Sequence, residues 1–227
     1  MQDCIYKDVC SLFNSQECNN ACIRYLEMSN LLNSSNLPKK LKAPVKLLAD
    51  SCDIEAFTKL AKIKSNIENL VVQGTNIYIY SQNCGNGKTS WAVKLLLKYF
   101  DCIWNGNGFR QRGLFIHVPS LLLNSKIFDQ KVISDELTNL KQLCYSVDLV
   151  VWDDIATNEA SAYEQNILIS LLDYRQNNGL ANIFTSNISP EQLEGVAGKR
   201  LSSRLCRGIK INIKGKDKRN GNIADIE

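Results

Sequence analysis

A short loop that ends in Gly-Lys-Thr carries the residue pattern of a phosphate-binding site. The loop SQNCGNGKTS follows the apolar run NIYIY directly and precedes a helical pattern. Its glycines let backbone N–H groups turn towards phosphate oxygens, and the N-terminus of the following helix adds the positive end of its dipole. The Lys88 ammonium would contact the β- and γ-phosphates, and the Thr89 hydroxyl would bind Mg²⁺. The loop residues predicted to bind the nucleotide are Cys84, Gly85, Asn86, Gly87, Lys88, Thr89 and Ser90.

One position of this loop departs from the usual pattern. Gln82 stands where such loops normally carry their first glycine. A polar turn that merely precedes a helix is the alternative interpretation. The order of strand, loop, Gly-Lys-Thr and helix argues against it.

Polar residues follow two further apolar runs. The run LVVW is followed by Asp153 and Asp154, and the run IFTS by Asn187. Ligands bind at the carboxyl ends of the strands in open α/β sheets, so these side chains are predicted to face the phosphate loop. Asp153 would complete the nucleotide site by holding Mg²⁺ together with Thr89, and Asp154 would orient the attacking water. The Asn187 amide would lie beside the γ-phosphate; acids and amides that only form turns are the structural alternative.

Three arginines lie on a predicted helix in the segment AGKRLSSRLCRG. Arg200 and Arg204 are four residues apart and share one face, and Arg207 follows three residues later. An arginine supplied to a neighbouring subunit could neutralise charge that develops on the γ-phosphate. A basic face that contacts solvent or nucleic acid is the alternative.

Five short runs of β-branched and aromatic residues alternate with helical patterns. The runs are NIYIY (76–80), GLFIHV (113–118), DLVVW (148–152), ANIFTS (181–186) and GIKINI (208–213). This alternation predicts an α/β fold with a five-stranded parallel sheet flanked by helices. The predicted organisation is a Cys-rich N-terminal domain at 1–34, a linker at 35–50, the α/β domain at 51–220 and a tail at 221–227.

Composition adds weaker constraints. The 227 residues carry a net charge of +4 and are 44% hydrophobic, enough for one α/β domain with a small appendage. We expect a cytoplasmic protein because the sequence has neither a secretory signal pattern nor an apolar run of about 20 residues. Residues 199–219 hold nine Lys/Arg and a single acid, Asp217. Such a strip suits a nucleic-acid backbone or a solvated surface.

Four of the nine cysteines lie close together near the N-terminus. Their spacing is Cys4-x5-Cys10-x7-Cys18-x3-Cys22, which supplies the four thiolates of a tetrahedral structural Zn²⁺. The gaps are looser than in paired Cys-x-x-Cys motifs, and four unrelated thiols are the alternative. The single histidine, His117, is expected to be a core or sheet residue and not a metal ligand.

The motifs resemble those of the bacterial and phage helicase loaders of the DnaC/DnaI type, within the AAA+ ATPases. The resemblance rests on IYSQNCGNGKTSWA, LVVWDDI, IFTSN and KRLSSRL and covers about residues 75–220. It implies ATP as substrate, an AAA+ core without a C-terminal helical lid, and Arg204 as the trans-acting arginine finger, with Arg200 as second candidate. It also implies self-association through the ATP interface, binding of single-stranded DNA, and a hexameric DnaB-type replicative helicase as partner.

Two other functions share these motifs. A transposition helper ATPase has a similar core, although the cysteine-rich N-terminus favours the loader. An ATP-gated adaptor that scarcely hydrolyses ATP is the other alternative, because Asp154 stands where many such ATPases carry Glu. The shorter side chain is consistent with slow hydrolysis.

The cysteine spacing yields a prediction about metal content. Loaders of the DnaI type carry a small zinc-containing N-terminal domain that contacts the helicase, which favours zinc here. We expect purified protein to carry about one zinc per chain. Elemental analysis of freshly reduced protein checks this, and finding no zinc would remove the hypothesis.

Overall fold

The protein folds around a five-stranded, fully parallel sheet. In the computed structural model, which describes residues 4–7, 10–42, 47–126, 131–156 and 161–218, the strand order is β2-β3-β4-β1-β5. The strands are β1 (Asn76–Tyr80), β2 (Gly113–His117), β3 (Leu149–Asp153), β4 (Ala181–Ser186) and β5 (Ile209–Asn212). All five lie where the sequence predicts strands, and the predicted fold class is confirmed.

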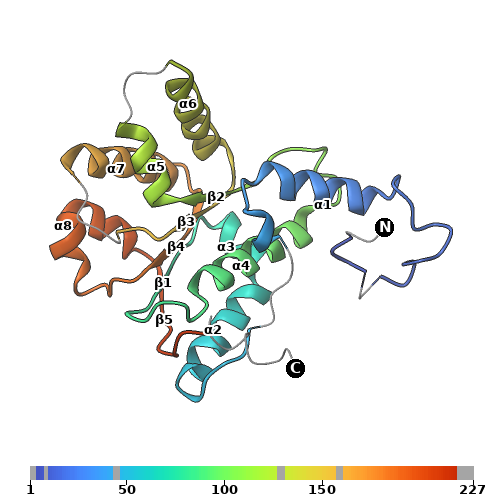
Figure 1. Ribbon diagram of the computed structural model, residues 1–227, viewed down its shortest axis with the longest axis horizontal. Coiled ribbons are helices and arrows are strands. Elements are labelled where there is room, and N and C mark those ends of the chain that lie inside the picture. The colour runs from blue at the N-terminus through green and yellow to red at the C-terminus, as the bar shows by residue number, and fades with distance from the viewer. Residues whose placement is uncertain (1–3, 8–9, 43–46, 127–130, 157–160, 219–227) are drawn as a thin grey trace, which may run out of the picture.

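Helices cover both faces of the sheet (Figure 1). They are α1 (Ile23–Ser34), α2 (Ile54–Ser65), α3 (Ile67–Val72), α4 (Lys88–Ile103), α5 (Val118–Lys126), α6 (Lys131–Ser146), α7 (Ala162–Asn177) and α8 (Leu193–Leu205), with short 3₁₀ turns at Lys39–Leu41 and Ser51–Asp53. Alternate residues of a strand point to opposite faces. Ile77 and Ile79 therefore join the core cluster of α1–α4, and Tyr78 joins that of α5–α8.

Strand register brings the predicted site residues to one edge of the sheet. Tyr80 of β1 pairs with Ser186 of β4, and His117 of β2 pairs with Asp153 of β3. The strands run in parallel, so the residues that follow them all lie at the carboxyl edge of the sheet. This edge is where open α/β sheets bind ligands.

The N-terminal helix α1 packs directly on the α/β domain. Its residues Met28 and Leu31 are fully buried in the same cluster as β1 and α4. Next to α1, the Phe115 N–H of β2 donates to the Ser35 carbonyl at 2.8 Å. The apolar face of α1 is therefore covered by the sheet domain, and the predicted domain boundary at residue 34 stays a prediction.

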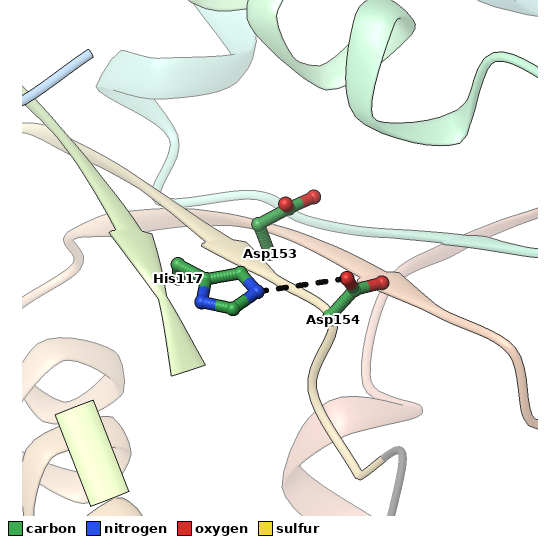
Figure 2. A group of neighbouring side chains, drawn as sticks. All are labelled: His117, Asp153 and Asp154. Atoms are coloured by element: carbon green, nitrogen blue, oxygen red, sulfur yellow. Dashed lines mark ion pairs between the residues drawn. The ribbon is translucent and has the colours of Figure 1, made fainter. Parts of the chain in front are cut away.

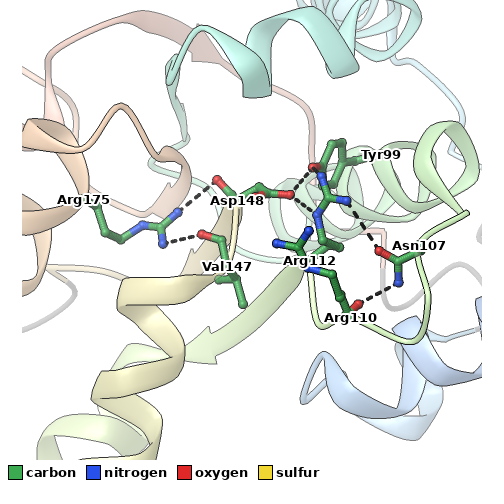
Figure 3. A network of polar contacts seen from close by, with 7 residues as sticks. All are labelled: Tyr99, Asn107, Arg110, Arg112, Val147, Asp148 and Arg175. Carbon is green, nitrogen blue, oxygen red and sulfur yellow. Dashed lines mark hydrogen bonds and ion pairs between the residues drawn. The ribbon is translucent and has the colours of Figure 1, made fainter.

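A buried arginine fastens the opposite, amino edge of the sheet (Figure 3). Arg175 of α7 has no exposed surface, and its Nε donates to the Asn182 side-chain oxygen at 2.7 Å. Its two terminal nitrogens donate to four carbonyls, those of Cys144, Val147, Asp148 and Ala181. Burial lowers the pKa of the Arg175 guanidinium to about 10. One cation thereby ties α7 to the end of α6 and to the starts of β3 and β4.

The Asp148 carboxylate points away from this arginine. It accepts hydrogen bonds from Tyr99 and from Arg112, which also contacts Asn107 (Figure 3). The two networks share only the backbone of Asp148.

None of the helices within the described ranges is long and apolar enough to cross a membrane.

Replacing Arg175 with leucine should lower the free energy of unfolding by about 3 kcal/mol, because several buried carbonyls lose their donors. Urea unfolding at neutral pH measures the change. Arg207→Leu, at an exposed position, is the matched control and should stay within about 0.5 kcal/mol of the wild type. Equal stability of the two variants would show that the Arg175 network contributes little.

Candidate nucleotide site

The phosphate loop connects β1 to the N-terminus of α4 and reverses at its two glycines. Gly85 has φ +66° and Gly87 φ +100°, values that residues with a side chain rarely adopt. The Lys88 side chain is largely buried, and its ammonium donates to the Asn83 carbonyl of the same loop at 2.8 Å. The Asn86 amide also holds the loop by donating to the Ser81 hydroxyl at 2.5 Å.

The departure at Gln82 has a structural explanation. Positive φ angles occur in this loop at Gly85 and Gly87, and Gln82 is not among the described residues with positive φ. Its side chain is exposed and its amide lies 3.5 Å from Gln192, which precedes α8. A side chain at position 82 is therefore compatible with the loop conformation.

The Asp153 carboxylate joins the loop to the sheet. One of its oxygens, Oδ1, accepts hydrogen bonds from the hydroxyls of Thr89 and Thr185, both at 2.7 Å. Asp153 is 5% exposed, and burial raises the pKa of its carboxyl although both hydroxyls oppose that shift. The predicted pairing of Thr89 and Asp153 is therefore present. A hydroxyl and a carboxylate are the hard oxygen donors that Mg²⁺ prefers, so these residues fit the ion.

Sequence reasoning missed Thr185. It lies one residue inside β4, and its hydroxyl also accepts the Asp154 N–H at 3.0 Å. The signal was available in IFTSN, because a threonine two positions before Asn187 shares one side of the strand with it. A buried polar side chain requires a hydrogen-bond partner, and the partner of Thr185 is Asp153.

Asp154 and His117 face each other beside Asp153 (Figure 2). Asp154 has φ +56°, an unusual backbone angle for a residue with a side chain. Its Oδ2 lies 3.8 Å from His117 Nε2, and the other ring nitrogen of His117 lies 2.8 Å from the Ser120 hydroxyl. The His117 side chain is 45% exposed, so of the two predicted places, core or sheet, His117 occupies the sheet, as the last residue of β2. Because it ends β2, the register with β3 carries it to the carboxyl edge.

The other residues predicted to be catalytic are Asn187, Arg204 and Arg200. Asn187 directly follows β4, whose neighbours are β1 and β3, and it is half-buried. Arg204 is paired within its own chain: both oxygens of the Asp173 carboxylate on α7 accept from its guanidinium. Arg200 is exposed, and Gly198, with φ +75°, breaks α8 before both arginines. The structure describes a single chain, so their action on a neighbouring subunit stays a prediction.

The four N-terminal cysteines are not gathered into a metal-binding group. Cys10 is exposed, and Cys4, Cys18 and Cys22 are partly exposed. Across the described ranges, the one cluster of three or more His, Cys, Asp or Glu ligand atoms within 4.8 Å of one another is His117, Asp153 and Asp154. The zinc site stays a prediction, and the positions of these four cysteines do not add support to it.

The raised pKa of Asp153 generates a prediction. Its ionised form carries an energetic penalty in the folded state, present above the raised pKa and lost as the pH falls from there towards the ordinary value of 3.8. Asp153→Asn should therefore raise the free energy of unfolding at pH 7, without Mg²⁺, by about 1 kcal/mol while weakening binding of the Mg²⁺-nucleotide.

Urea unfolding and nucleotide titration with and without Mg²⁺ measure both effects. The matched control is Asp154→Asn, whose side chain is 37% exposed and which should change stability by less than about 0.5 kcal/mol. A destabilised Asp153→Asn variant would contradict the assignment of a burial penalty.

Comparison with known proteins places this geometry in a known fold. The chain matches no protein-family model and no curated protein. Among solved structures, it is similar to the DnaC helicase loader (TM-score 0.62, 18% identity, 78% of this chain and 100% of that chain). It is also similar to DnaI (TM-score 0.61, 20% identity, 81% and 95%).

A third similar structure is the replication initiator DnaA bound to AMPPCP and single-stranded DNA, with TM-score 0.60 and 18% identity. That match covers 80% of this chain, which spans 52% of the DnaA chain. Sequence identities at this level establish the fold alone. The chain shares the α/β fold of the solved structures of DnaC, DnaI and DnaA.

Proposed function

We propose that this protein is an ATP-dependent loader that delivers a hexameric replicative helicase to single-stranded DNA. The observation that carries the proposal is the contact of Thr89 with Asp153 at the mouth of a phosphate loop, within a fold shared with two helicase loaders. A fold by itself does not specify a function. The proposal therefore rests on the nucleotide site. The similarity of the fold to two helicase loaders suggests the helicase as the partner.

ATP binding is supported by the phosphate loop. The Lys88 ammonium donates to the Asn83 carbonyl of the loop. When a nucleotide binds, this ammonium would exchange the carbonyl for β- and γ-phosphate oxygens. Bound Mg²⁺ would supply neutralisation of the phosphate charge, with Thr89 and Asp153 as the residues that hold it. The similar DnaA structure is bound to AMPPCP, which supports a nucleotide at this edge of the sheet.

Hydrolysis would depend on Asp154. Its carboxylate lies beside Asp153 at the carboxyl edge, where it would orient the attacking water, and Asn187 would lie on the other side of the γ-phosphate. The Asp154 Oδ2 lies 3.8 Å from His117 Nε2 of β2. The shorter side chain of Asp154, where many such ATPases carry Glu, favours slow turnover and keeps the ATP-gated adaptor as a second candidate function.

Self-association would bring Arg200 or Arg204 to the neighbouring nucleotide. Arg204 is held by the Asp173 carboxylate, so its use as a finger requires either release from Asp173 or orientation by it. Arg200 is exposed on the same helix and needs no such release.

Single-stranded DNA would bind the basic strip, in which six described cations are exposed: Lys199, Arg200, Arg207, Lys210, Lys214 and Lys216.

The partner can be tested by capture. Tagged wild-type protein with ATP should retain the replicative helicase hexamer from a mixture that also contains a transposase. The variant Lys88→Ala should retain much less helicase and should bind ATP roughly 100-fold more weakly, because a buried charge-assisted contact to the phosphates is lost. Lys94→Ala, on the same helix α4, is the matched control and should behave as wild type.

The outcomes separate the candidates. Capture of transposase alone would reject the loader. Helicase capture without ATP turnover, with or without single-stranded DNA, would favour the adaptor. Unchanged ATP affinity in Lys88→Ala would reject the phosphate-loop assignment itself.

A further inference from the structure

The chain that follows β5 turns back across the phosphate loop. The Ile213 N–H donates to the Tyr80 carbonyl at 2.9 Å, and the Ile213 carbonyl accepts the Asn86 amide at 3.1 Å. Five residues later, the Lys218 N–H donates to the Gly85 carbonyl at 3.0 Å. Residues 213–218, called the strap below, are thus fastened to the loop at both ends.

Further contacts hold the middle of the strap. The buried Asp53 carboxylate accepts the N–H groups of Lys214 at 2.6 Å and of Gly215 at 2.9 Å. From the opposite side, the Asn83 amide of the phosphate loop donates to the carbonyls of the same two residues, at 2.8 and 3.2 Å. The strap is therefore bound between the start of α2 and the loop. Asn83 has a second role, because its carbonyl accepts Lys88.

The acidic residue of the strap lies against the loop. A Cβ atom built on Gly85 would be 1.8 Å from Oδ1 of Asp217, so only a glycine leaves room for this carboxylate. Asp217 is the single acid among nine cations in residues 199–219, yet its charge lies on the loop that is predicted to receive phosphates. The Lys216 side chain is exposed, and the Lys218 ammonium donates to the Leu48 carbonyl.

We propose that the strap is an autoinhibitory element whose Asp217 carboxylate opposes nucleotide binding at Gly85. The inference rests on the proposed ATP-binding function of the loop. Nucleotide phosphates bound by the loop would carry the same sign of charge as the Asp217 carboxylate beside Gly85, so the two would repel. Binding therefore favours strap conformations in which Asp217 has left Gly85, and it breaks the contact between Lys218 and the same residue.

The coupling works in both directions. If nucleotide binding favours release of the strap, release must raise nucleotide affinity by the same factor. Release would also free the Lys218 N–H from the Gly85 carbonyl, whereas the side chains of Lys214 and Lys216 are already exposed. The nucleotide would thereby control the position of the strap backbone that carries three cations of the basic strip.

The test removes the charge of Asp217 while keeping its shape. Asp217→Asn should bind a fluorescent ADP analogue about tenfold more tightly than the full-length wild type. The matched control, Glu68→Gln, removes an equal charge at an exposed position of α3 and should leave the affinity unchanged. Trypsin supplies an independent readout, because ADP should accelerate cleavage after Lys214, Lys216 and Lys218 in the wild type.

Three results are distinguishable. Tighter binding by Asp217→Asn together with nucleotide-accelerated cleavage supports the strap. Equal affinity of Asp217→Asn and wild type, or protection of the strap from trypsin by ADP, overturns it while the loop assignment stands. No nucleotide binding by wild type, Asp217→Asn or Glu68→Gln overturns the proposed function as well.

Discussion

The carboxylate of Asp153 is the interaction on which the arrangement of the site depends. It receives the Thr89 hydroxyl from the first turn of α4 and the Thr185 hydroxyl from β4 while itself ending β3. Three elements that are distant in sequence are therefore fixed at one oxygen atom. Burial of this charge is unfavourable for folding, and the two hydroxyls offset only part of that cost. Residues of this kind are common where function requires a charge in a buried place.

The position of that oxygen follows from the parallel sheet. Parallel strands end at the same edge, so each strand contributes the residue that follows it to a common region. His117, Asp154 and Asn187 reach this region from the ends of β2, β3 and β4, which are neighbours in the sheet. The opposite edge is closed by Arg175, whose donors satisfy the carbonyls at the beginnings of two of the same strands.

The sheet, the phosphate loop and the Thr89–Asp153 pair could be predicted because each depends on local pattern. Apolar runs identify strands buried on both faces, and Gly-Lys-Thr between a strand and a helix identifies the loop. The contact of His117 with Asp154 could not be predicted because it depends on strand register, which a single sequence does not reveal. Thr185 carried a signal in IFTSN, but the identity of its partner, Asp153, depends on the same register. The packing of α1 was missed for a similar reason: its apolar residues indicate a buried face but not which surface covers it. The strap contains no motif at all, and its place on the loop depends on backbone carbonyls and on Asp53.

The Arg175 network has a consequence for how the domain assembles. Its five donors are satisfied only when α6, α7, β3 and β4 are all in place. A partly assembled sheet that docked α7 early would bury a cation with missing acceptors, which is unfavourable by several kcal/mol. Such intermediates are depleted, so this half of the domain is expected to fold cooperatively, with α7 docking as β3 and β4 pair. Arg175 thus destabilises partly folded forms of the domain more than it stabilises the folded domain.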